Sequence, residues 1–547
     1  MSGKHDFDWL VIGSGFGGSV SALRLAEKGY RVAVLESGRR YEDEDFATTT
    51  WNARRYYWLP RLGLRGIFRM TLFKDVFVVS GCGVGGGSLG YANTLYRPQP
   101  GSAFYRDPQW GKLEDWEAAL RPHYDTAEHM LGVTTYEGDG PADRLMRELA
   151  TEMGVPETYS TTRVGVFFGE PGETVADPYF GGDGPPRAGC IRCGACMVGC
   201  RHNAKNTLVK NYLWFAERAG VQVLPERTVS EIRPLGAPDG SGGYAVTSER
   251  SGAWVRKDRQ VLTARGVVVA AGALGTNALL QRCRLGGALP RLSDCIGHLV
   301  RTNSEAITAV TTKDDRHDFT KSIAITSSFY PDADTHIENV TYGPGADSIS
   351  LLFTILTAAG SALTRPVKLL RAALRHPFVF ARTLWPRRWS RRTVIILAMQ
   401  TLDNSMRLRP KRSLLGLGPR LQTEEDPDKP NPRFIEVADR VTRSAAQKLD
   451  ATPQSGLTEA LLNIPTTAHI MGGAVIGERP ETGVVDGHQR AFGYENLLVC
   501  DGSAIPANIG VNPSLTITAM TEHAMSHVPA REPRSAEADT DMDVAHR

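Results

Sequence analysis

Three observations predict an α/β protein with two interleaved domains. A strand, a glycine turn, a helix and a second strand follow one another over residues 7–38, and further strand-and-glycine segments recur in the middle and near the end of the chain. Between these segments, strand-like runs at 306–311, 322–330 and 394–399 predict an antiparallel sheet. We therefore expect a Rossmann-type domain interleaved with an α+β domain that is built on that antiparallel sheet.

The first segment has the pattern of a dinucleotide site. An apolar run leads into a glycine-rich turn, a helical pattern follows, and a second apolar run ends on Glu36. Gly13 permits a tight turn, Gly15 lets the backbone approach a pyrophosphate, and Gly18 lets helix and strand pack closely. Glu36 can accept a hydrogen bond from a ribose hydroxyl. A purely structural glycine turn is the alternative, but the complete order of elements favours the nucleotide site.

Three later segments, at 76–88, 266–276 and 496–503, extend this site. Each combines an apolar strand with a close turn, where the backbone can approach a flat ring or a phosphate. A site assembled from the start, middle and end of a chain suits a long ligand such as FAD, whereas the first segment alone also fits NAD. The expected cofactor contacts in the later segments are Gly83, Gly86, Gly272 and Asp501.

Four stretches together resemble the glucose–methanol–choline (GMC) oxidoreductases, and within them the cholesterol-oxidase-like flavoproteins of actinobacteria. The stretches are VIGSGFGGS (11–19), GVGGGSLGYAN (83–93), HIMGG (469–473) and DGSAIPANIGVNPSLTITAM (501–520). The resemblance implies a two-domain FAD enzyme that oxidises an alcohol, in this branch a sterol. It also adds Ser88 and Asn93 to the expected FAD contacts.

Alcohol oxidation needs a side chain that takes or holds the hydroxyl proton. By resemblance, His469 and Asn512 match the active-site pair of the family. A neutral imidazole can accept the hydrogen bond of the alcohol near neutral pH, and an amide can hold the substrate oxygen without changing charge. Without the resemblance, His469 reads as a structural histidine, and Asn512 before Pro513 also reads as a helix N-cap.

Glu338 is the third candidate catalytic residue. The resemblance implies a glutamate in a comparable strand that faces the steroid and carries a proton when the double bond migrates. Burial in an apolar pocket would raise the pKa of such a carboxyl group toward neutrality. A solvated glutamate at a strand edge is the alternative, and His336 beside it is interpreted as structural.

The composition indicates a large globular enzyme. The chain has 547 residues, 41% hydrophobic and 22% charged, and a net charge of only +3, which argues against nucleic acid as a main partner. No apolar run reaches the length of a transmembrane helix, and the first predicted strand leaves no room for a signal peptide. We expect a cytoplasmic protein, or one peripheral to the inner face of the membrane.

The motifs also suggest domain boundaries. We expect a discontinuous FAD-binding domain, a flavin-covering segment that contains a cysteine run, a substrate domain and a disordered tail. The FAD-binding domain is predicted to comprise 1–100, 205–300 and 465–530, and the flavin-covering segment 101–204. The substrate domain is predicted at 301–464 and the disordered tail at 531–547. A charged, proline-rich loop is expected at 423–432.

Four of the eight cysteines form the run Cys190, Cys193, Cys196 and Cys200. This spacing is typical of ferredoxin-type iron–sulfur ligation, and zinc is less favoured because its sites usually separate two pairs by a longer loop. Arginine rather than proline follows the last cysteine, and no second run is present. The alternative is a flavin-covering loop whose cysteines are free, disulfide-linked or packed.

Residues 363–393 combine basic, leucine-rich and aromatic residues. Lys368, Arg371 and Arg375 share one helical face, and the apolar residues Val367, Leu370 and Leu374 share another; Phe378, Phe380, Trp385 and Trp389 follow. A basic amphipathic segment of this kind suits an anionic membrane surface. A helical hairpin buried within the substrate domain is the alternative.

The function that the resemblance implies is FAD-dependent oxidation of a 3β-hydroxysteroid to the ketone, with or without migration of the double bond. The acceptor of the electrons is oxygen or an electron carrier. Two alternatives remain: a dehydrogenase of another hydrophobic alcohol that uses an iron–sulfur cluster and a carrier, and a flavin-bearing electron-transfer or accessory subunit.

Overall fold

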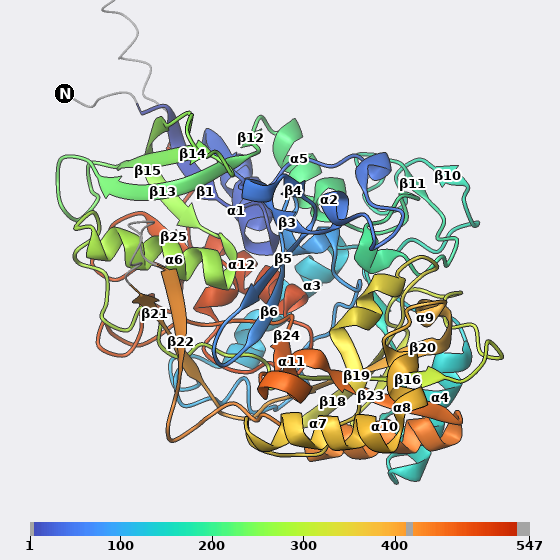
Figure 1. The fold of residues 1–547 in the computed structure, drawn as a ribbon. Helices are drawn as coiled ribbons and strands as arrows, with labels where there is room; N and C mark the ends of the chain where they lie inside the picture. Colours follow the sequence, from blue (N-terminus) through green and yellow to red (C-terminus); the bar gives the residue numbers. More distant parts are fainter. Residues whose placement is uncertain (1–4, 412–419, 533–547) are drawn as a thin grey trace, which may run out of the picture.

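The computed structural model describes residues 5–411 and 420–532, and two large sheets organise it (Figure 1). The predicted tail at 531–547 lies almost wholly outside the described residues. No helix in the described ranges is both long enough and apolar enough to cross a membrane.

The first sheet joins strands from the start, middle and end of the chain. Its strands in spatial order are β12 (Gln222–Leu224), β2 (Val32–Leu35), β1 (Phe7–Ile12), β15 (Gln260–Val269), β14 (Tyr244–Arg250) and β13 (Arg227–Pro234), with β25 (Leu497–Val499) also paired to β15. The strands β12, β2, β1, β15 and β25 pair in parallel. This arrangement confirms the predicted Rossmann-type domain.

Helices cover the first sheet because their apolar residues face its buried strands. α1 (Phe16–Glu27) is almost entirely buried and packs against α12 (Ser514–Ser526) and α5 (Tyr212–Arg218). α6 (Gly272–Leu285) packs against β13, and α3 (Trp116–Met130) packs against α12. Strands buried on both faces read as continuous apolar runs, which is why β1 and β15 were visible in the sequence.

The second sheet is wholly antiparallel, as predicted. Its order is β19 (Phe353–Ile355), β23 (Ala451–Gly456), β16 (Ala306–Thr312), β20 (Thr393–Gln400), β18 (Thr335–Val340), β17 (Ser327–Phe329) and β8 (Ser160–Thr161). α4 (Pro141–Glu152) and α10 (Glu436–Lys448) pack on one face. The other face carries an apolar cluster that includes Ile325, Val340 and Leu397.

The remaining helices and strands lie outside the two large sheets and the helices named above. They are α2 (Ala53–Tyr56), β3 (Trp58–Leu59), β4 (Leu64–Arg65), β5 (Phe68–Leu72), β6 (Phe77–Gly81), β7 (Thr134–Thr135), β9 (Arg163–Val164), β10 (Thr174–Val175), β11 (Arg187–Ala188), α7 (Thr364–Arg375), α8 (Pro377–Thr383), α9 (Trp389–Arg392), β21 (Met406–Lys411), β22 (Arg420–Glu425), α11 (Leu457–Leu462) and β24 (Thr466–Thr467). The loop predicted at 423–432 is wrong at its start, because Thr423–Glu425 pair with β21 in a two-stranded ribbon.

Candidate active site

A cavity of about 590 Å³ lies between the two sheets. Its lining includes the glycine turn after β1, the loop after β6, the start of α6 and the loop before α12. Six of the ten expected cofactor contacts line it: Gly13, Gly15, Glu36, Gly86, Gly272 and Asp501. The cavity therefore joins the segments that the sequence identified separately.

The glycines of the first turn differ in what surrounds them. A Cβ atom on Gly15 would meet no atom within 4 Å, so this position faces open space at the N-terminus of α1. A Cβ on Gly18 would lie 2.0 Å from the carbonyl oxygen of Gly13, and Gly13 itself has φ +102. Gly15 thus leaves room for a ligand, whereas Gly18 and Gly13 allow close packing of helix on strand.

Glu36 holds the turn in place at the end of β2. Its carboxylate accepts hydrogen bonds from the backbone N–H and hydroxyl of Ser14 (3.0 and 2.7 Å) and from the N–H of Gly38 (2.7 Å). Glu36 lines the cavity although only 5% of its surface is exposed. A helix N-terminus beside an acid at this strand end is the arrangement that dinucleotide cofactors use.

Asp501 links the C-terminal loop to α6. Its carboxylate accepts hydrogen bonds from the N–H of Gly272 (2.9 Å), the hydroxyl of Thr276 (2.5 Å) and the N–H of Ser503 (2.7 Å). Burial raises the pKa of Asp501, while its hydrogen bonds act in the opposite direction. The wall formed by the C-terminal loop is therefore fixed to the wall formed by the middle of the chain.

The other four expected contacts lie outside the cavity lining. Gly18 packs on Gly13, as described, and a Cβ on Gly83 would meet the side chains of Leu89 and Tyr41. The Ser88 hydroxyl donates to the Gly85 carbonyl (2.7 Å) and accepts from the Leu208 N–H (3.0 Å). The buried amide of Asn93 has no hydrogen-bond partner among the described residues, and its backbone has φ 72. These positions shape the loops around the cavity.

His469 lies on the cavity wall and pairs with a buried glutamate. Its Nδ1 forms an ion pair with Oε1 of Glu305, whose side chain is fully buried, and Glu305 Oε2 accepts from the N–H of Ala468 (2.8 Å). Burial lowers the pKa of His469, but the charge and hydrogen bond of Glu305 outweigh it, so the pKa lies above its usual value. With Nδ1 engaged, Nε2 is the nitrogen left for a ligand in the cavity.

Asn512 also lines the cavity, at the start of the loop into α12. Its Nδ2 donates to Oε2 of Glu338 (3.3 Å), and its buried Oδ1 has no partner among the described residues. The predicted N-cap role is wrong, because Pro513 occupies the cap position and no side chain caps the helix. One N–H of the amide is instead turned toward Glu338, which leaves its second N–H as a donor and Oδ1 as an acceptor for a ligand.

Glu338 is fully buried on β18 and lies behind Asn512 rather than on the cavity lining. Burial raises its pKa to about 7, while the Asn512 hydrogen bond and the His469 charge act in the opposite direction. This excludes the solvated strand-edge alternative. His336 has a pKa lowered to about 3 by burial and stacks on Tyr330, so it stays neutral and structural.

The part of the cavity wall that the second sheet contributes is apolar. Aliphatic side chains come from β16, β18 and β20 and from the loop before β17, and an aromatic side chain comes from β19. These residues are Ile307, Ile325, Val340, Ile395, Leu397 and Phe353. A bulky hydrophobic ligand can contact this wall while its polar end reaches His469 and Asn512.

The cysteine run lies beside this cavity. All eight cysteines are within the described residues, and all are free thiols. Cys190, Cys193, Cys196 and Cys200 line a small cavity of about 20 Å³, and in the described ranges no three side chains of the ligand types are placed to hold one metal ion. Met197, next to Cys196, lines the large cavity. The thiols as placed do not form a ready metal site.

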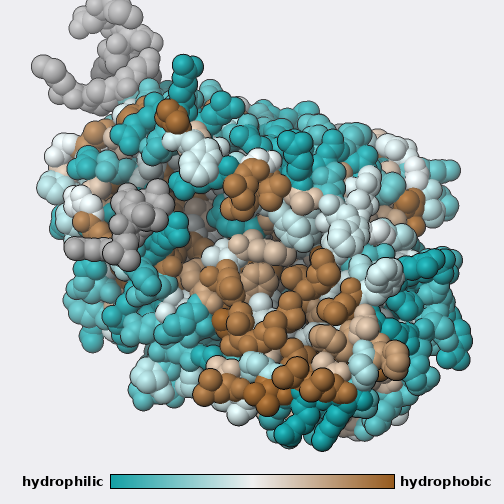
Figure 2. All heavy atoms as spheres, viewed as in Figure 1, coloured by the Kyte–Doolittle hydropathy of each residue, from teal (hydrophilic) through white to brown (hydrophobic). Residues whose placement is uncertain are grey.

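The segment 363–393 exposes its apolar face. Figure 2 shows hydrophobic residues gathered over α7, α11 and β19. The exposed apolar side chains of this surface are Leu351, Leu363, Val367, Leu370, Leu374, Phe378, Leu384, Trp385, Leu461 and Leu462. The buried-hairpin alternative therefore fails for α7, although Trp389 is only 3% exposed and packs on Phe353 in the core.

Sequence reasoning missed Glu305. The available signal was the group of polar residues Arg301, Asn303 and Glu305 directly before the apolar strand β16, since polar side chains next to a buried strand need partners when they are buried with it. Which partners they find depends on contacts between distant segments.

The fold and site define a class first: an oxidoreductase whose dinucleotide cavity opens on an apolar substrate space. Family models described as GMC oxidoreductase match residues 187–298 and 403–521, and one described as an NAD(P)-binding Rossmann-like domain matches 11–41. A cholesterol oxidase of Mycobacterium tuberculosis is 50% identical over 534 residues, 96% of this chain and 91% of that protein. A cholesterol oxidase of Acinetobacter baumannii is 46% identical over 542 residues, 98% of this chain and 97% of that protein.

Among solved structures, pyridoxine 4-oxidase from Mesorbium loti covers 96% of this chain and 100% of its own, with a TM-score of 0.60 and 15% sequence identity. At that identity the likeness shows the fold alone. The chain belongs to the GMC oxidoreductase family, and it is an FAD-dependent oxidoreductase acting on CH–OH donors.

Proposed function

We propose that the protein oxidises the 3β-hydroxyl group of a sterol to a ketone, with oxygen as the electron acceptor. The observation that carries the proposal is the pair His469 and Asn512 in a cavity whose wall from the second sheet is apolar. The names of the relatives from M. tuberculosis and A. baumannii support the choice of a sterol and of oxygen. A rigid hydrophobic alcohol fits such a site because its single hydroxyl group would find partners at this pair and none on the apolar wall.

Each of these residues has a separate role at the hydroxyl group of the substrate. Nε2 of neutral His469 accepts the hydroxyl proton, and Glu305 stabilises the imidazolium that forms. The second N–H of Asn512 donates to the substrate oxygen and holds it beside the imidazole. The Gly13–Gly18 turn, Glu36 and the 501–512 loop would hold FAD, whose flavin would supply the acceptor for the hydride that leaves the carbinol carbon.

Glu338 is proposed to move the proton during migration of the double bond from the 5-ene to the 4-ene position. A pKa of about 7 allows a carboxyl group both to take and to return a proton near neutral pH. Because Asn512 lies between Glu338 and the cavity, access to the steroid requires the amide to move aside.

We also propose that the apolar surface over α7 and α11 contacts a lipid bilayer. Leu352 and Phe353, next to exposed Leu351, line the large cavity, and so do Leu457 and Thr458 of α11. The surface is therefore continuous with the substrate space. The basic residues of α7 would face anionic headgroups, each contributing roughly 1 kcal/mol.

A second candidate function is a dehydrogenase that passes electrons through an iron–sulfur cluster to a carrier. The guanidinium of Arg187 favours it, because this group is buried and has no hydrogen-bond partner among the described residues. Buried Lys205 donates to the Cys196 carbonyl (2.9 Å), and burial lowers its pKa to about 7. Both cations would suit an anionic group, but the small volume between the thiols favours the first candidate.

One preparation tests both candidates. Purified protein is mixed anaerobically with a 3β-hydroxysteroid, and the flavin absorbance is followed before and after oxygen is admitted. Bleaching by the steroid and rapid recovery in air are expected; bleaching by other alcohols only would contradict the sterol proposal. Iron and acid-labile sulfide in stoichiometric amounts, with slow recovery in air, would establish the second candidate.

A further inference from the structure

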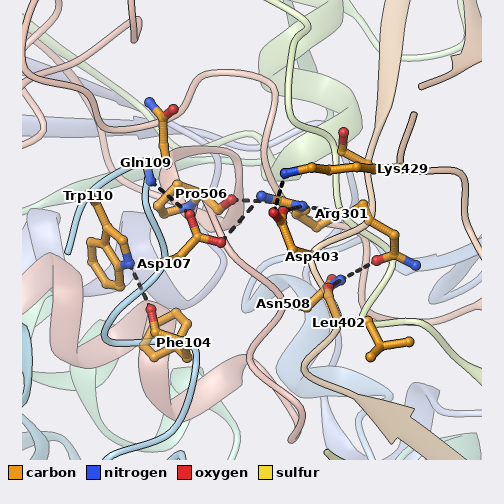
Figure 3. Close-up of polar contacts among 12 residues, drawn as sticks. Phe104, Asp107, Gln109, Trp110, Arg301, Leu402, Asp403, Lys429, Pro506 and Asn508 are labelled. Carbon is orange, nitrogen blue, oxygen red and sulfur yellow. Dashed lines mark hydrogen bonds and ion pairs between the residues drawn. The ribbon is translucent and has the colours of Figure 1, made fainter. Parts of the chain in front are cut away.

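Residues 301–305 contact both segments that carry the active-site pair, and Figure 3 shows the Arg301 end of these contacts. Arg301, Asn303 and Glu305 are 1%, 0% and 3% exposed, so all three residues are buried away from solvent. Buried polar groups are retained when they are hydrogen-bonded. The partners of these three side chains therefore indicate what the segment does.

Arg301 fastens the loop that leads to Asn512. Its Nε donates to the carbonyl of Pro506 (2.8 Å), and its Nη1 donates to Oδ1 of Asp403 (2.8 Å) and to the carbonyl of Asn404 (2.7 Å). Lys429 pairs with the other oxygen of Asp403 (Figure 3). The backbone of Arg301 exchanges two hydrogen bonds of 2.9 Å with Met471, two residues after His469.

Asn303 also contacts the loop that leads to Asn512. Its Oδ1 accepts from the N–H of Gly510 (2.8 Å), its Nδ2 donates to the carbonyl of Val511 (2.9 Å), and its own N–H donates to Oδ1 of Asn508 (2.8 Å). Asn303 and Ser304 both have positive φ, at 60 and 46. Two consecutive non-glycine residues with left-handed φ values have a strained backbone, and such a conformation persists where the surrounding contacts fix it.

Glu305 contacts the segment that carries His469: its carboxylate pairs with the His469 imidazole and accepts from the N–H of Ala468. We propose that residues 301–305 are a brace that fixes His469 relative to Asn512, and that Glu305 is a positioning residue that keeps the proton on Nδ1 of His469. Nε2 is then presented as the acceptor toward the substrate. This inference rests on the proposed function only for the identity of that substrate.

The brace predicts separate effects for its two ends. The groups whose charge acts on His469 are Glu305 and, on β18, Glu338. Removing the charge of Glu305 should lower the pKa of His469 by about one to three units, the usual effect of an adjacent opposite charge. Removing Asn303 contacts should displace Asn512 without changing the pKa of His469.

The test compares Glu305→Gln, Asn303→Ala and the control Glu152→Gln, whose carboxylate is half exposed on α4. The pKa of His469 is measured in FAD-loaded protein from hydrogen–deuterium exchange at the imidazole C2 position, resolved by mass spectrometry. We expect a lower pKa of His469 in Glu305→Gln only. In that variant the rise of the flavin reduction rate with pH should shift to lower pH by the same amount. In Asn303→Ala we expect roughly tenfold slower reduction at every pH, with this rise at an unchanged pH.

An unchanged pKa of His469 in folded Glu305→Gln would overturn the proposal. If that variant does not load FAD, Glu305→Asp keeps the charge but moves it away from the imidazole, so slower reduction is expected, with a His469 pKa below the parental value; parental behaviour would overturn the proposal. If the parent is not reduced by the steroid, the proposed function fails, while the exchange measurement still decides the role of Glu305.

Discussion

Replacing His469 by alanine should slow reduction of the flavin by the steroid without releasing FAD. The imidazole lies on the cavity wall, and its loop is held by backbone contacts of Ala468 and Met471 that the change leaves in place. The substitution therefore removes the proton acceptor while the cofactor-binding loops stay intact. It also leaves Glu305 buried without its partner, which lowers stability, so folding has to be verified separately.

The expected size follows from the role assigned to the imidazole. A positioned general base contributes roughly 10²- to 10⁴-fold, which corresponds to about 2.7 to 5.5 kcal/mol of activation free energy. Asn512→Ala loses a hydrogen bond to an oxygen that gains charge, worth about 1.5 to 3 kcal/mol, or roughly 10- to 150-fold. The two losses should be less than additive, because both groups hold the same oxygen.

The assay is anaerobic stopped-flow reduction at saturating steroid, with His129→Ala as the control because this exposed histidine lies on α3. In the parent, the rate should rise with pH through a pKa above 6.5, since only neutral His469 accepts the proton and Glu305 raises its pKa. His469→Ala should lack this limb. Parental rates in His469→Ala, or an unchanged acid limb, would refute the assignment.

Three further predictions concern the cofactor, the second proton transfer and the membrane. Gly15→Val should fold but contain little FAD, because its side chain would enter open space at the cavity, and full flavin content by absorbance would contradict this. Glu338→Gln should yield the 5-ene-3-ketone in place of the 4-ene product, as read by the ultraviolet absorbance of the conjugated enone, and 4-ene product at the parental rate would exclude its role. Replacing Lys368, Arg371 and Arg375 with Glu should reduce binding to anionic vesicles and slow turnover of vesicle-held steroid, with little change in detergent. Equal vesicle binding by parent and variant would count against the surface.

The sequence predicted the fold well where the pattern is local. The 7–38 unit and the apolar strands of the second sheet appear as periodicity and glycine spacing over short windows, and both sheets formed as expected. Residues 423–425 were misassigned because their partner strand, β21, sets their conformation, and the charged sequence Thr-Glu-Glu carries little strand signal of its own. Trp389 read as a surface aromatic, but its place directly before β20 carries it into the core.

The candidate site was predicted in part, and the limit has a physical cause. Glycine motifs located the cofactor cavity, because close backbone approach needs glycine wherever it occurs. The partner of His469 could not be found in this way, since Glu305 contacts a segment 163 residues away. The orientation of Asn512 likewise follows from Glu338 on β18, not from the neighbouring proline.

In the proposed function, the position of the charges determines which end of a substrate reacts. Glu305 contacts His469 and Glu338 contacts Asn512, and both carboxylates are fully buried. The wall that the second sheet contributes, which includes Ile307 and Phe353, is apolar. A hydroxyl group placed against that wall would lose its hydrogen bonds to water without replacement, a cost of about 1 to 3 kcal/mol. A sterol should therefore enter from the apolar surface with its hydroxyl group toward His469. A steroid with a second hydroxyl group at the far end of the ring system should bind more weakly by that amount, measured as a higher KM with little change in kcat, and equal KM values would show that the far wall is hydrated.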